Sequence, residues 1–255
     1  MPCVHARFYA ELNDHLPRDK QYRRYAISLS APRPLAEVIQ QEGVPLAEID
    51  VILVNGSSVG AECLLRDGDS LSAYPVFETF DVTPLIRLRA RPLRQVKFVL
   101  DVHLGKLATF LRMLGFDAVY SNAFTDEQLV TRSCCEGRVL LSRDRRLIAR
   151  EELTRGYLVR DEEPLRQLQE VVERFDLRGS FAPFTRCLPC NALLVPVDKR
   201  EVFDRLPAHV RGSFQEFSLC PLCRRVYWQG SHYEKMRAFV ERLRTGKAPS
   251  DSPHG

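Results

Sequence analysis

The stretch Val96-Lys97-Phe98-Val99-Leu100-Asp101 is a short apolar run that ends on a carboxylate. Its apolar residues do not alternate with polar ones, which is typical of a strand that is covered on both faces in a parallel sheet. An acidic side chain at the end of such a strand is locally unfavourable. The stretch therefore predicts a buried first strand and singles out Asp101 as a residue with a chemical task.

The residues that follow repeat the order strand and helix four times. The further strands that we expect are Ala118–Tyr120, Val139–Leu141 and Tyr157–Val159. The helices that we expect cover about 104–114, a segment that begins with the capping box Thr125-Asp126-Glu127-Gln128, about 145–153, and a segment that begins at Pro164. Parallel strands joined by right-handed crossovers are the expected outcome.

Four acidic residues lie just beyond the predicted strands. They are Asp101, Asp126, Asp144 and Asp161. The carboxyl ends of parallel strands meet at one edge of a sheet, so we expect these carboxylates to gather there. Gathered carboxylates repel one another unless a cation neutralises them, and Mg²⁺ or Mn²⁺ prefers such oxygen ligands. Such ions can activate water and bridge a phosphate oxygen, which predicts metal-dependent hydrolysis of phosphodiester bonds.

A purely structural interpretation is also open for each acid. Asp126 and Glu127 could complement the dipole of the helix that they begin. Asp144 could be only an N-cap, and Asp161 stands beside two glutamates that are typical of a helix start. The spacing of the whole set carries more information than any single acid.

Basic residues accompany these acids. Residues 1–80 carry 7 basic and 11 acidic side chains, whereas residues 81–255 carry 30 and 22. A basic C-terminal part suits a polyanionic partner such as RNA or DNA, although a solvated arginine-rich surface has the same composition. The candidate contacts to a phosphate backbone are Lys106, Arg112, Arg143 and Arg145. Arg143 and its neighbours could equally pair with Glu151 or Glu152.

Two C-x-x-C pairs, Cys187-Leu188-Pro189-Cys190 and Cys220-Pro221-Leu222-Cys223, are separated by 29 residues. Each pair brings two thiolates to one ion, and two pairs close a tetrahedron around Zn²⁺. The protein then fills all four positions, which predicts a structural metal. An iron–sulfur cluster or a redox dithiol pair is the alternative.

Basic and aromatic residues alternate around the second cysteine pair. They are Arg224, Arg225, Tyr227, Trp228 and Tyr233. RNA bases stack on such rings, which makes a substrate contact one interpretation. The other is that a small ribbon needs Trp228 for its own core.

The N-terminal stretch predicts a small α+β module. Val4–Tyr9 and Tyr25–Leu29 have the pattern of paired strands, and a helix is expected from Pro34 to about Gln41. The segment Leu65-Arg66-Asp67-Gly68-Asp69-Ser70-Leu71 resembles the ubiquitin-like sulfur carriers of the molybdopterin and thiamine pathways. Those carriers end in a free Gly-Gly, whereas this chain continues into another domain. A docking or binding role is therefore expected in place of carrier chemistry.

A wider resemblance rests on four segments: Phe98-Val99-Leu100-Asp101, Leu104-Gly105-Lys106-Leu107-Ala108, Leu111-Arg112-Met113-Leu114-Gly115 and Leu141-Ser142-Arg143-Asp144-Arg145. They resemble the PIN-like ribonuclease domain of the Mut-seven C-terminal RNase family, whose members carry a zinc ribbon after the nuclease core and often a ubiquitin-like module before it. The resemblance implies an RNA substrate. It also implies that Asp101, Asp126 and Asp144 bind the catalytic metal, with Asp161 or Glu127 as a fourth member.

We therefore predict an α/β protein of three folded parts: a ubiquitin-like β-grasp module (1–80), a PIN-like nuclease domain (96–180) and a zinc ribbon (181–245), with a basic linker (81–95) and a disordered tail (246–255). The predicted function is metal-dependent hydrolysis of RNA. The alternative is a non-catalytic RNA-binding or adaptor protein, with a protein partner on the ubiquitin-like module.

The sequence also bears on localisation. No apolar run approaches the ~20 residues that cross a bilayer. The stretch Met1–Ala10 lacks the basic and then apolar pattern of a secretion signal. A cytoplasmic protein without a membrane partner is the expectation.

Overall fold

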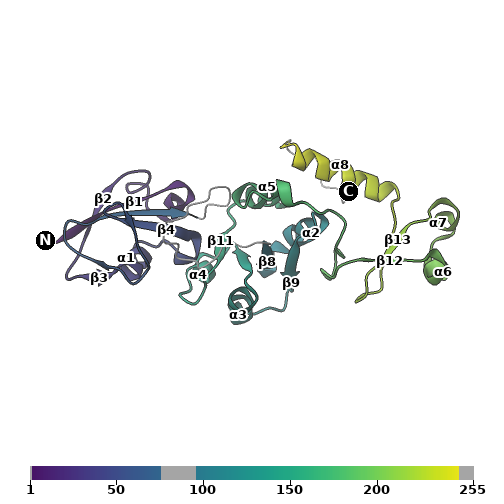
Figure 1. Cartoon of the computed structure of the whole chain (residues 1–255), viewed down its shortest axis with the longest axis horizontal. Coiled ribbons are helices and arrows are strands. Elements are labelled where there is room, and N and C mark those ends of the chain that lie inside the picture. The colour runs from purple at the N-terminus through teal and green to yellow at the C-terminus, as the bar shows by residue number, and fades with distance from the viewer. Residues whose placement is uncertain (1, 76–95, 247–255) are drawn as a thin grey trace. The chain divides into compact units, whose positions relative to one another are not determined.

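The computed structural model describes residues 2–75 and 96–246 of the chain (Figure 1). It contains two compact units, of which one comprises Met1–Gln95 with Thr125–Leu158 and the other Val96–Phe124 with Val159–Gly255. The predicted linker 81–95 lies outside the described residues, as does the predicted tail beyond Gly246. The predicted limits of the folded parts stay a prediction.

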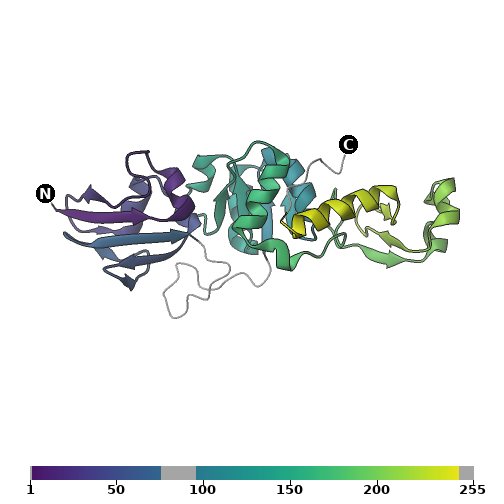
Figure 2. The ribbon, with the colours of Figure 1, turned by 90° about the horizontal axis from the view of Figure 1, so that it is seen from above.

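The N-terminal module is a β-grasp fold, as predicted. Its main sheet has the order β2-β1-β7-β4-β5, with β1 parallel to β7 and antiparallel to β2. Figure 2 shows the purple strand β1 beside a blue strand of the same sheet. The elements are β1 (Cys3–Phe8), β2 (Tyr25–Ser28), β3 (Arg33–Pro34), α1 (Leu35–Gln41), β4 (Ile49–Val54), β5 (Ser57–Ser58), β6 (Leu64–Leu65) and β7 (Ser70–Pro75), with 3-10 turns η1 (Ala10–His15) and η2 (Leu46–Glu48).

The alternation of buried and more exposed side chains along β1 explains how this module packs its core. Val4, Ala6 and Phe8 are the buried residues of β1, and they pack on the apolar side of α1. Helix α1 ends where Gly43 adopts a φ of +82°, a conformation that costs glycine little. Every second side chain of β1 is buried, and this alternation sets the register of the sheet.

The part of the chain that follows residue 96 contains parallel strands joined by helices, as predicted. Strand β8 pairs with β9, strand β10 pairs with β11, both pairs are parallel, and the sheet order is β11-β10-β8-β9. The strands are β8 (Lys97–Leu100), β9 (Asp117–Tyr120), β10 (Val139–Ser142) and β11 (Gly156–Leu158). The helices are α2 (Gly105–Met113), α3 (Asp126–Glu136), α4 (Arg145–Ile148) and α5 (Pro164–Arg174), with 3-10 turns η3 (Val102–Leu104) and η4 (Leu177–Ser180).

Local signals set the starts of these helices. Thr125 and Gln128 form the predicted capping box, and Gly137 closes α3 in the left-handed conformation. The Glu163 side chain caps α5, whose first residue is Pro164. These contacts satisfy backbone N–H groups that have no partner inside a helix.

Helix α4 is shorter than predicted. The expected helix runs to about residue 153, but α4 ends at Ile148. The chain then turns, the N–H of Leu153 bonds to the carbonyl of Arg150 at 3.1 Å, and the Leu153 side chain is buried. Burial of this leucine outweighs continuation of an exposed helix.

The C-terminal module is a three-stranded antiparallel sheet with three helices. Its sheet order is β12-β13-β14. The elements are β12 (Val195–Val197), α6 (Lys199–Val202), α7 (Ala208–Ser213), β13 (Phe217–Leu219), β14 (Val226–Tyr227) and α8 (Ser231–Arg244), with the 3-10 turn η5 (Phe203–Arg205). One small apolar cluster of this module consists of Val202, Leu206, Val210 and Phe217. Among the helices of the described ranges, none combines the length and apolar character that a membrane crossing requires.

Candidate functional site

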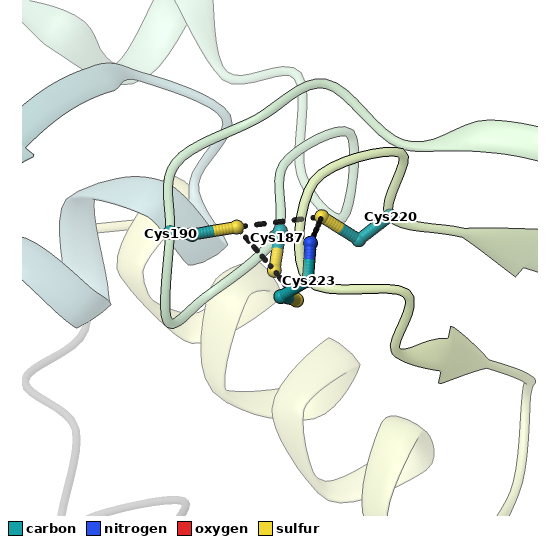
Figure 3. A group of neighbouring side chains, drawn as sticks. All are labelled: Cys187, Cys190, Cys220 and Cys223. Carbon is teal, nitrogen blue, oxygen red and sulfur yellow. Dashed lines mark hydrogen bonds between the residues drawn. The ribbon is translucent and has the colours of Figure 1, made fainter.

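The four predicted cysteines lie together at one point of the C-terminal module (Figure 3). Their Sγ atoms all fall within 4.8 Å of one another. The Sγ of Cys190 is 3.3 Å from that of Cys187 and 3.3 Å from that of Cys220. Cys187 and Cys220 are buried, whereas Cys223 is exposed. Both C-x-x-C pairs therefore face one common centre.

The two cysteine loops, residues 187–192 and 220–225, have the same backbone conformation. The N–H of Cys187 bonds to the carbonyl of Ala192, and the N–H of Cys220 bonds to the carbonyl of Arg225, five residues on in both cases. The residue after each second cysteine has a positive φ, +68° at Asn191 and +62° at Arg224. This tight turn holds both thiol groups of a loop on the same side of the chain.

Burial and hydrogen bonds act in opposite directions on these thiols. Burial raises the pKa of Cys187 to about 12. Burial also opposes ionisation of Cys220, but backbone N–H groups of Cys223 and Leu222 and the neighbouring thiols lower its pKa to about 6. Burial and the contact with Cys187 raise the pKa of the Tyr227 hydroxyl. Several thiolates so close together need a cation as counter-charge.

The cysteine cluster can bind a metal ion such as zinc. Four thiol donors converging from two loops match the tetrahedral preference of Zn²⁺. The Tyr227 hydroxyl lies 3.2 Å from the Sγ of Cys187 and so fixes that ligand from outside the cluster. Tyr227 is a supporting residue that the sequence motif alone did not reveal.

Arg112 does not lie where RNA would reach it. Its side chain is buried, with 4% of the residue exposed. The guanidinium donates to the carbonyls of Ala118, Leu188 and Pro189, each at 2.8 Å. The prediction of a phosphate contact is therefore corrected: Arg112 joins α2 and β9 to the first cysteine loop. Burial lowers its pKa, and the nearby thiols oppose that effect.

We expect the Arg112→Met variant to lose about 2–4 kcal/mol of unfolding free energy, because three backbone carbonyls, of which that of Ala118 is buried, lose their donor while the side-chain volume is kept. Urea unfolding followed by circular dichroism measures this loss. The matched control is Lys106→Met, an exposed position of the same helix, which should change stability by less than about 0.5 kcal/mol. Equal stability of the two variants would remove this role of Arg112.

Two further residues fix the first cysteine loop, and the sequence analysis did not identify them. Asn191 accepts from the N–H of Ala118 at 3.0 Å and donates to Asp117 at 2.7 Å. Arg186 donates to the carbonyls of Gly115 and Asn191. Asparagine tolerates a positive φ, so its place directly after a C-x-x-C pair was an available signal. Arg186 had no such signal.

Asp101 and Asp144 are each placed directly after a strand. Asp101 follows β8, only 8% of it is exposed, and its carboxylate accepts from the N–H of Val102 at 2.6 Å. Asp144 follows β10, is exposed, and accepts from the N–H of Arg146 at 2.7 Å through Oδ1. Asp144 is thus the N-cap of α4, and its Oδ2 has no protein partner within the described ranges.

The other predicted acids have different surroundings. Asp126 is exposed at the first position of α3, and its carboxylate has no partner among residues that the structure describes. The Asp161 carboxylate accepts from the N–H of Glu163 at 2.9 Å and so shapes the turn before α5. Glu127 pairs with Arg150 at 3.3 Å. Asp161 and Glu127 therefore have structural roles of their own.

The acids are divided between the compact units. Asp101 and Asp161 belong to one, and Asp126 and Asp144 to the other. Within residues 2–75 and 96–246, the donor atoms of the four cysteines lie close enough together to share a metal ion. The carboxylates of these ranges form no group of three or more that does the same. The convergence of the acids stays a prediction.

The predicted basic contacts are surface residues, apart from Arg112. Lys106, Arg143 and Arg145 are exposed. The side chains of Lys106 and Arg145 have no ion-pair partner in the described part of the chain, whereas Arg143 has interactions within the protein. Free cationic groups of this kind are available to a polyanion.

A β-grasp module, a parallel α/β sheet with acids after its strands, and a four-cysteine ribbon define a class of multidomain ribonuclease-type proteins. The chain belongs to the Mut7-C RNAse domain family, which matches residues 96–240. The Mut7-C ubiquitin family matches residues 1–81 ahead of it. The predicted resemblance and the order of its parts are thereby confirmed. Neither a curated protein nor a solved structure matches the chain.

Proposed function

We propose that the protein hydrolyses RNA phosphodiester bonds with the help of Mg²⁺ or Mn²⁺. The observation that carries this proposal is the position of Asp101, a largely buried carboxylate directly after a central parallel strand, in a chain of the Mut7-C RNAse domain family. Ligand sites of parallel sheets lie beyond the carboxyl ends of their strands. Carboxylate oxygens are the donors that these cations prefer.

Asp101, Asp126 and Asp144 are the residues that would hold the divalent ion. When bound, such an ion lowers the pKa of water and neutralises phosphate charge. Asp144 caps α4 with Oδ1, which leaves Oδ2 available, so capping and ligation are compatible. Asp161 would be an outer member, because its carboxylate already serves a turn.

The basic side chains would hold the RNA backbone. Lys106 and Arg145 are exposed cations without ion-pair partners in the described part of the chain, and each stands a few residues from a proposed metal-binding acid. Arg143 is the third candidate. Contacts of this kind position the substrate without reading its sequence.

The four cysteines would hold a structural Zn²⁺ ion. The cluster is complete without water or substrate, so its metal has no open position for chemistry. The cysteine loop is bound to α2 and β9 through Arg112 and Asn191. The ion would therefore order the module and keep it attached to this part of the nuclease region.

The ubiquitin-like module would bind a protein partner. One side of the module is already occupied by a later segment of the same chain. The buried carboxylate of Glu48 accepts from the N–H of Leu158 at 2.8 Å and pairs with His15 at 2.8 Å. Tyr22 and Leu64 are large side chains exposed elsewhere on the module. Leu64→Asp should weaken binding of a captured partner, and unchanged binding would exclude this position.

The test of the proposed reaction is a cleavage assay with zinc-loaded protein and a single-stranded RNA. We expect cleavage on addition of Mn²⁺ or Mg²⁺ and none above background without them, because the carboxylates need the cation to engage phosphate. Gel analysis of end-labelled RNA measures this. Binding of RNA without cleavage at any divalent metal concentration would instead support a non-catalytic RNA-binding protein.

A further inference from the structure

The C-terminal module contains a cavity of about 520 Å³, apart from every residue assigned to catalysis above. Aromatic and apolar side chains form most of its wall, from the strands β12, β13 and β14, from α8 and from the segment before the first cysteine loop. This volume lies within the range of about 300–1,000 Å³ that is typical of small-ligand pockets. The cavity is large enough for a nucleobase with its ribose.

Four aromatic rings line this cavity and remain partly exposed: Phe184, Tyr227, Trp228 and Tyr233. The rings of Phe184 and Tyr233 lie 4.5 Å apart between centroids and are tilted by 49°. Tyr227 is fixed by its contact with the Sγ of Cys187. The cysteine cluster therefore holds the Tyr227 side of the cavity, and the four rings are available to a planar ligand.

Phe184 has an unusual backbone conformation. Its φ is +62°, which is rare and strained for a bulky residue. Its N–H bonds to the carbonyl of Met113 at 3.1 Å, which helps to hold the strained conformation. Such strain persists where the surroundings impose it, and it is concentrated at ligand sites.

The wall of the cavity carries the cation Arg186 and the carboxylate Glu216, and the module around it is positive. Residues 181–246 carry 11 basic and 6 acidic side chains, so the module remains cationic even after four thiolates bind one Zn²⁺. The exposed side chains of Arg224 and Arg225, just before β14, form no ion pair with described residues. Two exposed guanidinium groups on the module that contains the aromatic cavity match a ligand with planar bases and a phosphate backbone.

The cavity wall also contains polar side chains. Gln215 and Gln229 each offer an amide donor and an amide acceptor, and Ser218 offers a hydroxyl group. A nucleobase needs both donors and acceptors on its edge, whereas an apolar peptide side chain would leave them unpaired. The wall therefore favours RNA over a hydrophobic peptide.

We propose that this aromatic cavity binds an unstacked base of single-stranded RNA, with Trp228 and Tyr233 as stacking partners and Arg224 and Arg225 at the phosphates. The proposal rests on the proposed RNA-cleaving function, which it extends by giving the ribbon a substrate-binding role. Double-stranded RNA would be a poor ligand, because its bases are stacked in the helix.

Trp228 makes the test direct, since it is the sole tryptophan of the chain. The full-length zinc-loaded protein is titrated with a 12-nucleotide oligoadenylate, without Mn²⁺ or Mg²⁺, while tryptophan fluorescence is followed. We expect saturable quenching by the single strand and much weaker quenching by a duplex of the same length. No quenching by the single strand would overturn the proposal.

Variants separate stacking from simple charge attraction. Tyr233→Ala should weaken binding of a fluorescently labelled oligoadenylate roughly five- to a hundredfold, the range expected for one stacked base. The matched control is Phe203→Ala, an aromatic residue of the same module that is 42% exposed but does not line this cavity. Equal weakening in both variants, or in neither, would contradict the stacking role.

Two outcomes keep this inference distinct from the proposed function. Metal-dependent cleavage that is as fast in Tyr233→Ala as in the natural protein, at RNA concentrations far below saturation, would refute the cavity but leave the nuclease intact. Quenching of Trp228 by RNA in a protein that never cleaves would retain the cavity and refute the nuclease. Quenching of Trp228 by an apolar peptide, with no quenching by RNA, would overturn the proposal and show that the cavity is a protein-docking site.

Discussion

Replacing Asp144 with asparagine should lower metal-dependent RNA cleavage by at least about a hundredfold, because one charged ligand of the proposed ion is lost and each 1.36 kcal/mol of lost transition-state stabilisation is a factor of ten. The fold should be retained. Asparagine is as good an N-cap as aspartate, so the contact with the N–H of Arg146 can be kept. Single-turnover cleavage rates at saturating Mn²⁺ measure the effect.

The chain offers a closely matched control for this variant. Asp198 caps the four-residue helix α6 as Asp144 caps α4, and its Oδ1 accepts from the N–H of Arg200 at 2.8 Å. Asp198→Asn changes the same charge at the same kind of helix start, within the cysteine-containing module. It should cleave RNA at the normal rate, since no catalytic role is proposed for it.

Asp101→Asn completes the comparison. Its carboxylate is largely buried, so this variant also needs a stability measurement. Loss of cleavage in Asp101→Asn and Asp144→Asn together, with normal thermal unfolding and a normal Asp198→Asn rate, is the pattern expected of shared metal ligands. If Asp144→Asn cleaves at the rate of Asp198→Asn, the carboxylate is a helix cap alone and the proposed site is wrong.

Replacing Cys220 with serine should release zinc and unfold the C-terminal module. Zinc binding contributes on the order of 10–16 kcal/mol to the folding of small zinc modules, and serine does not provide a thiolate. The apolar cluster shared by α6, α7 and β13 is small, with four buried side chains, so it cannot compensate for that loss. Elemental analysis should give about one zinc per natural chain and far less in the variant.

Cys135→Ser is the control for this change. Cys135 is exposed on α3, is not one of the four clustered cysteines, and forms no hydrogen bond with residues in the described ranges. This variant should keep its zinc and its resistance to limited proteolysis within 181–246, whereas Cys220→Ser should be cut there. Full zinc content in Cys220→Ser would show that the cluster binds no zinc through that residue.

Much of the fold could be predicted because it depends on patterns within a few residues of the sequence. The capping box at Thr125 and the proline that begins α5 fix helix starts through contacts within a few residues. The unbroken apolar run before Asp101 indicates a buried strand for the same reason. The end of α4 was predicted wrongly, since Leu153 turns inward to a core that its neighbours in sequence do not reveal.

The candidate site was less accessible to such patterns. C-x-x-C spacing predicts a metal site directly, because the two thiol groups of each loop are close in sequence. Arg112 was misassigned, because a positive charge on a helix looks like a surface contact until the carbonyls of Leu188 and Pro189 are placed around it. Those partners are 76 and 77 residues away in the chain.

The sequence by itself determined the order of the parts, the β-grasp and parallel strands, and the identity of the four thiol ligands. Each of these depends on periodicity or on spacing over a few residues. Only the tertiary structure decided that Arg112 and Asn191 fasten the cysteine loop, and that aromatic rings from distant segments enclose a cavity beside it. The reason is physical. Burial and hydrogen-bond partners depend on which residues are neighbours in space, and the order of the 255 residues along the chain does not show this directly.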